Sequence, residues 1–142
     1  MIFTLEAIQA DQGDCLILHY GSAKKPRFLL IDGGPAGVFK AALQPRLNAL
    51  KDRWSPGDAL PLQMVMVSHV DDDHIRGVLD LTAMLTDRLD DMRPLPFTIR
   101  TLWHNSFDDI LGNEDDKLFA ALAAAARPVA TGGAVPAGLH LS

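Results

Sequence analysis

The sequence predicts a mixed α/β (α+β) fold, and three of its features carry that prediction. Alternating apolar and polar residues near the N-terminus are typical of half-buried strands. An apolar run at 64–67 is too short for a surface helix and ends at Ser68, as expected of a strand buried on both faces. Two longer segments, 38–54 and 75–89, repeat apolar residues at helical spacing. With 142 residues, 48% hydrophobic and 22% charged, the chain has a globular composition and is long enough for at most one domain, 1–142.

Three predicted strands follow one another at the N-terminus. They cover residues 2–9, 15–20 and 27–32, with turns at 11–14 and 21–26. Connections this short join antiparallel neighbours. We therefore expect an antiparallel meander.

Two side chains of the second strand have chemistry of their own, and a structural role is favoured for both. His19 shares a strand face with Cys15 and Ile17, so it is interpreted as a partly buried histidine with a hydrogen-bond partner rather than a metal ligand. No activating base lies near Cys15 in the sequence, so we interpret it as a small core residue. The single cysteine excludes an internal disulfide and agrees with a reducing compartment.

Residues 32–35, Asp-Gly-Gly-Pro, connect the third strand to the first helical segment. The glycines permit a positive φ or a close approach of backbone at a crowded sheet edge. From the residues alone, a plain turn capped by Asp32 explains this segment equally well.

Proline and glycine residues qualify the two helical segments. Pro45 predicts either a kink in the first segment or a short helix followed by a second one with Pro45 in its first turn. A loop at 55–58 and Pro61 precede the central strand. Gly77 costs the second helix roughly 1 kcal/mol of propensity. Tight packing of its first turn is the expected reason.

The remainder of the chain contains one further strand and one further helix. Residues 92–96 form a linker, 97–103 a strand ending at His104, and 113–127 an alanine-rich helix before a glycine- and proline-rich segment. For His104, pocket lining or a structural hydrogen bond is favoured over a metal role.

Residues 68–74, Ser-His-Val-Asp-Asp-Asp-His, contain several side chains of the kinds that bind metal ions. In extended backbone alternate residues point the same way, so His69, Asp71 and Asp73 are expected to converge while His74 faces elsewhere. Consecutive carboxylates repel one another unless a cation or a helix N-terminus compensates for their charge. Asp72 or Asp73 would serve as the N-cap of the helix that follows. Imidazole and carboxylate together suit zinc, with manganese or iron as alternatives, better than calcium or magnesium. A solvated acidic loop with incidental histidines is the competing interpretation.

This segment resembles the metal-binding motif of the metallo-beta-lactamase superfamily, His-x-His-x-Asp-His, with Asp71 in place of the second histidine. Over residues 68–77 the pattern Ser-His-x-Asp-x-Asp-His-x-x-Gly is similar to the branch that contains the nuclease domain of competence DNA-uptake channel proteins. Residues 12–14 (Gln-Gly-Asp) and 30–34 (Leu-Ile-Asp-Gly-Gly) also resemble that branch and occur in the expected order. The resemblance covers residues 12–77, about half of the chain.

The resemblance implies both a fold and a set of site residues. The fold is a four-layer αββα sandwich made of a duplicated strand-and-helix unit, and this chain would form its N-terminal half. His69 and Asp71 would hold one metal ion, and Asp73 and His74 a second. Asp73 would also be the catalytic residue that orients or deprotonates a water molecule. Asp32 would lie behind the ligands and orient them.

The activity that the resemblance implies is that of a metal-dependent hydrolase acting on a phosphodiester or a related ester through a metal-activated water. The formal charge of −5 gives no general attraction for phosphate backbones, so a small-molecule or nucleotide-type substrate is favoured. A nucleic-acid substrate would need a local basic patch or help from the metal. Asp14 could reach the same pocket and ranks below Asp32. A non-catalytic scaffold of the same fold, binding a partner or a ligand, is the competing hypothesis.

Two further expectations concern the surroundings of the protein. The first residues lack a basic leader before a long apolar core, and no window of the sequence approaches a membrane span, so we expect a cytoplasmic protein without membrane association. An isolated half-sandwich would expose a large apolar sheet face, which soluble monomers rarely do. A C-terminal half or a partner chain is therefore expected to complete the sandwich.

Overall fold

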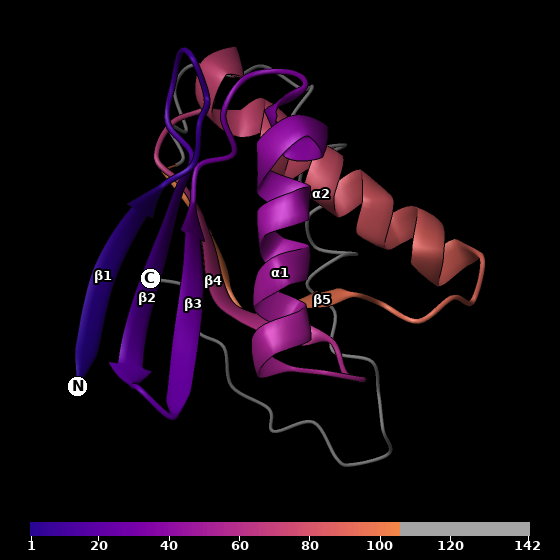
Figure 1. Cartoon of the computed structure of the whole chain (residues 1–142). Helices are drawn as coiled ribbons and strands as arrows, with labels where there is room; N and C mark the ends of the chain where they lie inside the picture. The colour runs from indigo at the N-terminus through magenta and orange to yellow at the C-terminus, as the bar shows by residue number, and fades with distance from the viewer. Residues whose placement is uncertain (106–142) are drawn as a thin grey trace, which may run out of the picture.

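Residues 1–105 of the computed structural model are described here, and they form a mixed α/β unit in which six strands make one sheet (Figure 1). The predicted helix at 113–127 and the segment after it lie outside this range. The elements are, in chain order, β1 (Ile2–Ala7), β2 (Leu16–Ser22), β3 (Lys25–Ile31), the π-helical turn η1 (Phe39–Leu43), α1 (Gln44–Trp54), β4 (Leu60–Val67), α2 (Asp72–Asp90), β5 (Phe97–Ile99) and β6 (Leu102–His104).

The sheet combines an antiparallel and a parallel part. Strands β1, β2 and β3 pair antiparallel, which confirms the predicted meander. Strand β4 pairs parallel to β3 on one side and to β5 and β6 on the other. Parallel neighbours need a long crossover connection, and α1 and α2 provide the two crossovers. The mixed α/β class is therefore confirmed, whereas the complete αββα sandwich stays a prediction.

The predicted strand at 97–103 is divided into β5 and β6, but both halves keep one register on β4. Leu62 pairs with Ile99, and three residues further along Val65 pairs with Leu102. Backbone hydrogen bonds bridge the interruption, since Arg100 N donates to Leu62 O and Val65 N donates to Thr101 O. The edge of the sheet is thus continuous along β4.

Strand β4 begins earlier than the sequence indicates. Pro61 lies inside the strand rather than before it, and Leu60 N donates to Pro96 O on the β5 side. The pairing of β4 with β3 starts only at Leu62, so the missing N–H of Pro61 leaves no hydrogen bond of the β3 ladder unmade.

The helices cover one face of the sheet. Side chains alternate across the strands, and those that face the helices are fully buried: Ile17, Phe28, Leu30, Leu62 and Val65. Leu43, Leu47, Val78, Leu81 and Leu85 of the helical segments complete this core. None of the helices within residues 1–105 has the length and apolar character needed to cross a membrane.

The opposite face of the sheet is also apolar but is not covered by either helix. Cross-strand neighbours on it are Leu5, Leu18, Leu29 and Met64 in one row and Leu16, Ile31, Met66 and Trp103 in another. Trp103 is 44% exposed, and Phe3 on β1 is 77% exposed. The expectation that the central strand is buried on both faces is wrong within residues 1–105, because Met64 and Met66 are only partly buried. The second layer that would cover them remains a prediction.

Pro45 stands at the start of a second helix after a short helical turn, which is the second of the two arrangements predicted for it. It lies in the first turn of α1, immediately after the π-helical turn η1, in which Gln44 N donates to Phe39 O. A proline cannot donate to the carbonyl four residues earlier, and the wider turn occurs where that hydrogen bond is missing.

A polar triad joins β1, β2 and α1 at the edge of the core. Glu6 accepts hydrogen bonds from Arg46 Nε at 2.6 Å and Arg46 Nη2 at 3.1 Å, and its Oε2 lies 2.8 Å from His19 Nε2. This confirms the structural role predicted for His19. Partial burial raises the pKa of Glu6, but Arg46 and His19 outweigh that effect, so the net pKa is lowered from its ordinary value of 4.5.

The triad predicts a stability difference that depends on pH. Because the folded-state pKa of Glu6 is depressed, its stabilising contribution is complete above pH 4.5 and declines as the pH falls through the lower folded value. Glu6→Gln should lower the free energy of unfolding at pH 7 by about 1 kcal/mol at most, since the group is partly open to solvent. Urea unfolding at a series of pH values measures this difference. Asp52→Asn, on the exposed side of α1, is the control; a Glu6→Gln deficit that persists undiminished in acid would contradict the prediction.

Candidate metal centre

The candidate centre lies where two parallel strands end side by side. Residue Asp32 follows β3, and Ser68 follows β4. The backbone N–H of Asp32 donates to Met66 O at 2.8 Å, so the two chain segments leave the sheet together. This position, at the carboxyl edge of a sheet, is the usual location of sites in open α/β folds.

Helix α2 begins inside the run of aspartates, and this sets the direction of each side chain. Asp71 is its N-cap residue, without a side-chain capping hydrogen bond, and Asp72 is its first residue. The prediction that Asp72 or Asp73 would cap the helix is therefore wrong by one or two residues. The expectation that His74 faces elsewhere is also wrong, because successive residues turn by about 100° in a helix rather than alternating as in a strand. His74 is 8% exposed and points into the site.

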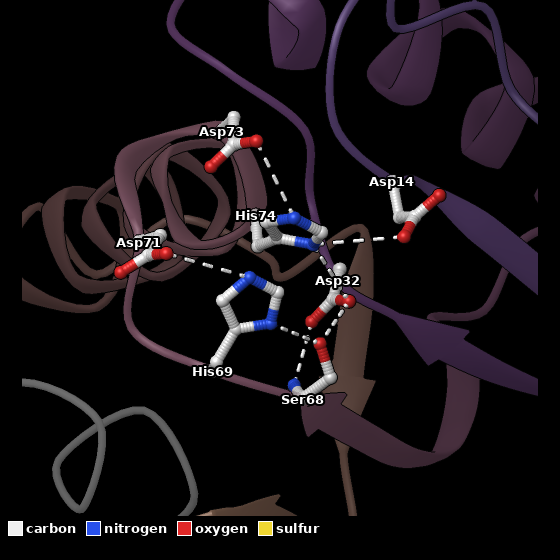
Figure 2. Close-up of polar contacts among 7 residues, drawn as sticks. All are labelled: Asp14, Asp32, Ser68, His69, Asp71, Asp73 and His74. Atoms are coloured by element: carbon white, nitrogen blue, oxygen red, sulfur yellow. Dashed lines mark hydrogen bonds and ion pairs between the residues drawn. The ribbon is translucent and has the colours of Figure 1, made fainter.

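Three of the four predicted ligands come together. His69, Asp73 and His74 can each place one ligand atom within 4.8 Å of the others. The ring centroids of the two histidines are 3.7 Å apart, and Asp73 Oδ2 lies 3.4 Å from His74 Nε2 (Figure 2). Asp71 stands at the margin: its Oδ2 is 3.7 Å from His69 Nε2, and its side chain is 74% exposed. Asp72 points outward and pairs with Arg76 at 3.0 Å.

Asp32 holds this group from behind. Its side chain is 2% exposed, and its backbone has a positive φ of 56°. Its Oδ1 accepts from Ser68 N at 2.7 Å, and its Oδ2 accepts from Ser68 Oγ at 2.6 Å and lies 3.2 Å from His74 Nδ1. A carboxylate in this position orients an imidazole and leaves its other nitrogen, Nε2, for a metal ion.

Asp14 approaches the centre from the loop before β2. Asp14, Asp32 and His74 form a second group of possible ligands, with Asp14 Oδ2 3.8 Å from His74 Nδ1. However, a His74 Nδ1–H that donates to Asp32 cannot bind a cation through the same nitrogen. The group of His69, Asp73 and His74 is therefore the better candidate, and Asp14, 60% exposed, lies at its rim.

Close backbone packing holds the first turn of α2 in place. Gly33 N donates to His74 O at 2.6 Å, and Gly77 N donates to Gly34 O at 3.1 Å. A Cβ on Gly77 would collide with the carbonyl of Gly33, and one on Gly13, where φ is 79°, would collide with the carbonyl of Asp73. The predicted reason for Gly77, tight packing beneath the site, is confirmed.

Neither Cys15 nor His104 belongs to the candidate centre. Cys15 is 1% exposed; burial, together with the charge of Asp32, raises its pKa to about 12, so almost no thiolate exists at neutral pH. His104, at the end of β6, pairs with Val67 of β4, just before the metal loop. It is in neither group of possible ligands found within residues 1–105.

A hollow of about 620 Å³ is lined by none of the candidate ligands but shares a loop with the centre. Residues 9–12, residues 35–38 and the start of the first helical segment line it. The loop that forms one wall continues into Gly13, which packs on Asp73, and Asp14, which faces His74. The same loop thus contacts both the hollow and the candidate ligands.

Two contributions to the site were not anticipated from the sequence. One is Ser68, which is the first residue of the pattern at 68–77 but has no predicted role of its own. The other is Gly13, which was expected to form a turn but also packs beneath Asp73. No protein-family model, curated protein or solved structure matches the chain. The interpretation of the centre therefore rests on its own geometry and on the resemblance of its motifs.

Proposed function

We propose that the chain is part of a metal-dependent hydrolase in which His69, Asp73 and His74 hold a zinc ion. The observation that carries this proposal is the convergence of two imidazoles and a carboxylate from one loop and helix start, with the buried Asp32 behind His74. Two nitrogen ligands and one oxygen ligand leave a position open in a tetrahedral shell, as catalytic zinc sites do. Manganese and iron accept the same ligands.

A zinc ion at this position would activate a water molecule and polarise the bond under attack. The protein residues would divide the remaining work. The side chain of His74 is 11% exposed, so it serves as a fixed ligand. That of Asp73 is 49% exposed and can reach both the metal ion and a water molecule on the open side. Asp73 is therefore the proposed catalytic residue, which orients the water or accepts its proton.

The proposed substrate is a phosphodiester or a related ester, and this part of the proposal comes from the resemblance. Asp14, Asp71 and Asp73 surround the centre with negative charge, so a long polyanion would be repelled unless the metal neutralises its phosphate. A small-molecule or nucleotide-type substrate fits this charge better. The hollow that shares the loop at 9–12 with the centre is the proposed place for the part of the substrate that is not attacked.

Zinc titration of the purified chain, combined with hydrolysis of bis(p-nitrophenyl) phosphate, tests the proposal. We expect stoichiometric zinc, loss of hydrolysis on treatment with a chelator, and recovery when zinc is returned. Substoichiometric metal together with unchanged folding in the presence of chelator would contradict the metal site and favour the non-catalytic scaffold. Stoichiometric zinc without hydrolysis would retain the site and contradict the activity of this chain alone.

A further inference from the structure

The hydroxyl of Ser68 lies between two side chains of the candidate centre. Its oxygen is 2.6 Å from Asp32 Oδ2 and 2.9 Å from His69 Nδ1 (Figure 2). A serine hydroxyl has one hydrogen to donate, and a carboxylate can only accept. The hydrogen of Ser68 therefore belongs to the bond with Asp32, and a separation of 2.6 Å is typical of a hydroxyl bound to a carboxylate.

The direction of this bond determines the one that follows. Because Ser68 donates its hydrogen to Asp32, its Oγ must accept the hydrogen bond from His69. His69 Nδ1 therefore carries the proton. The lone pair of His69 is then on Nε2, the nitrogen that faces Asp71 at 3.7 Å on the open side of the centre. In water a neutral histidine prefers its proton on Nε2. The contact with Ser68 therefore reverses the intrinsic preference.

The Asp32 carboxylate contacts the second histidine, His74, directly, without an intervening hydroxyl. Asp32 Oδ2 lies 3.2 Å from His74 Nδ1, and Asp32 Oδ1 is occupied by the backbone N–H of Ser68. With 2% of its surface exposed, Asp32 has little contact with competing water. One buried carboxylate thus places both ring protons on Nδ1, directly at His74 and through a hydroxyl at His69.

We propose that Ser68 is a positioning residue that transmits the orientation set by Asp32 to His69 and so presents His69 Nε2 to a cation. The last step, toward the cation, rests on the proposed function. The relay itself is a property of the metal-free protein. It assigns Ser68 a role distinct from that of a residue that merely ends β4.

Nitrogen-15 NMR of the histidine rings in the metal-free protein near neutral pH tests the relay. In the wild type, His69 and His74 should both be protonated on Nδ1. In Ser68→Ala, His69 should shift toward the Nε2-protonated form, while His74, which contacts Asp32 directly, should keep its proton on Nδ1. Ser68→Thr retains the hydroxyl and should restore the wild-type signal of His69. The unchanged His74 signal also reports that the fold is intact.

Zinc affinity provides the second readout. Ser68→Ala should weaken binding by about 10–100-fold, the range typical of residues that orient metal-binding histidines, and Ser68→Thr should restore it. An Nε2-protonated His69 in the wild type, or an unchanged His69 in Ser68→Ala, would overturn the relay. If the wild type shows the expected protonation but binds no zinc, the relay stands and the proposed function fails. If zinc binds while His69 is protonated on Nε2, the relay fails and the proposed function stands.

Discussion

Asp73→Ala should abolish zinc binding and hydrolysis together, whereas Asp72→Ala should leave both close to the wild-type values. The two aspartates are neighbours in the first turn of α2, so each substitution removes the same charge from the same helix end. Only Asp73 faces the candidate centre, 3.4 Å from His74 Nε2. Asp72 is directed outward and pairs with Arg76. The comparison therefore separates ligation from a general electrostatic effect.

Isothermal titration with zinc measures the first consequence, and phosphodiester hydrolysis the second. For Asp73→Ala the loss of zinc affinity should exceed about 100-fold, the upper end of the range for residues that only support a ligand. The free energy of unfolding of either metal-free variant should change by less than about 1 kcal/mol, because the side chain of Asp72 is 77% exposed and that of Asp73 is 49% exposed. Equal losses of zinc affinity in the two variants would show that Asp73 acts through its charge and not as a ligand.

Gly77→Ala should destabilise the protein by roughly 2–4 kcal/mol, at the upper end of overpacking effects. Alanine has a higher helix propensity than glycine, so on propensity alone this change would be stabilising. Here the added Cβ would meet the backbone of Gly33, which cannot move aside as a flexible side chain could. Separating α2 from the β3 loop would also break the hydrogen bonds Gly33 N to His74 O and Gly77 N to Gly34 O.

Gly37→Ala is the matched control for Gly77→Ala. At Gly37 nothing lies within 4 Å of an added Cβ, but φ is 91°, so alanine there should cost about 1–2 kcal/mol through backbone strain alone. Urea unfolding compares the two variants, and zinc titration shows whether the ligands have moved. Gly77→Ala should weaken zinc binding because Asp73 and His74 lie in the turn directly before Gly77 and would move with it, and Gly37→Ala should not. A stability of Gly77→Ala equal to or above that of the wild type would contradict the packing described for this turn.

Local sequence patterns predicted most of the secondary structure. The antiparallel meander follows from short turns between alternating segments, and the position of Pro45 at the start of α1 follows from its missing N–H. The strand ends were less predictable. Pro61 was placed outside β4, but a proline is tolerated within a strand before pairing on one side begins, and that depends on a partner strand distant in sequence.

The candidate site was predicted in its residue types but not in its arrangement. Extended spacing across 69–74 would bring Asp71 into the group and exclude His74, whereas the helix starting at Asp72 does the reverse. Where a helix begins in a run of three aspartates depends on packing, here of Gly13 against Asp73 and of Gly33 against Gly77. The contacts of Asp32 with Ser68 and His74 join residues 36 and 42 positions apart, and no local pattern specifies such hydrogen bonds.

Anomalous scattering from crystals of the zinc-loaded protein, measured at the zinc absorption edge, tests the central claim most directly. The claim is that two imidazoles and one carboxylate at the start of α2 hold a metal ion. The expected result is a zinc peak bound by Nε2 of His69, Nε2 of His74 and a carboxylate oxygen of Asp73, with Asp32 still behind both rings. Crystals grown with excess zinc in which this position holds no metal, while the three side chains are turned toward solvent, would contradict the account.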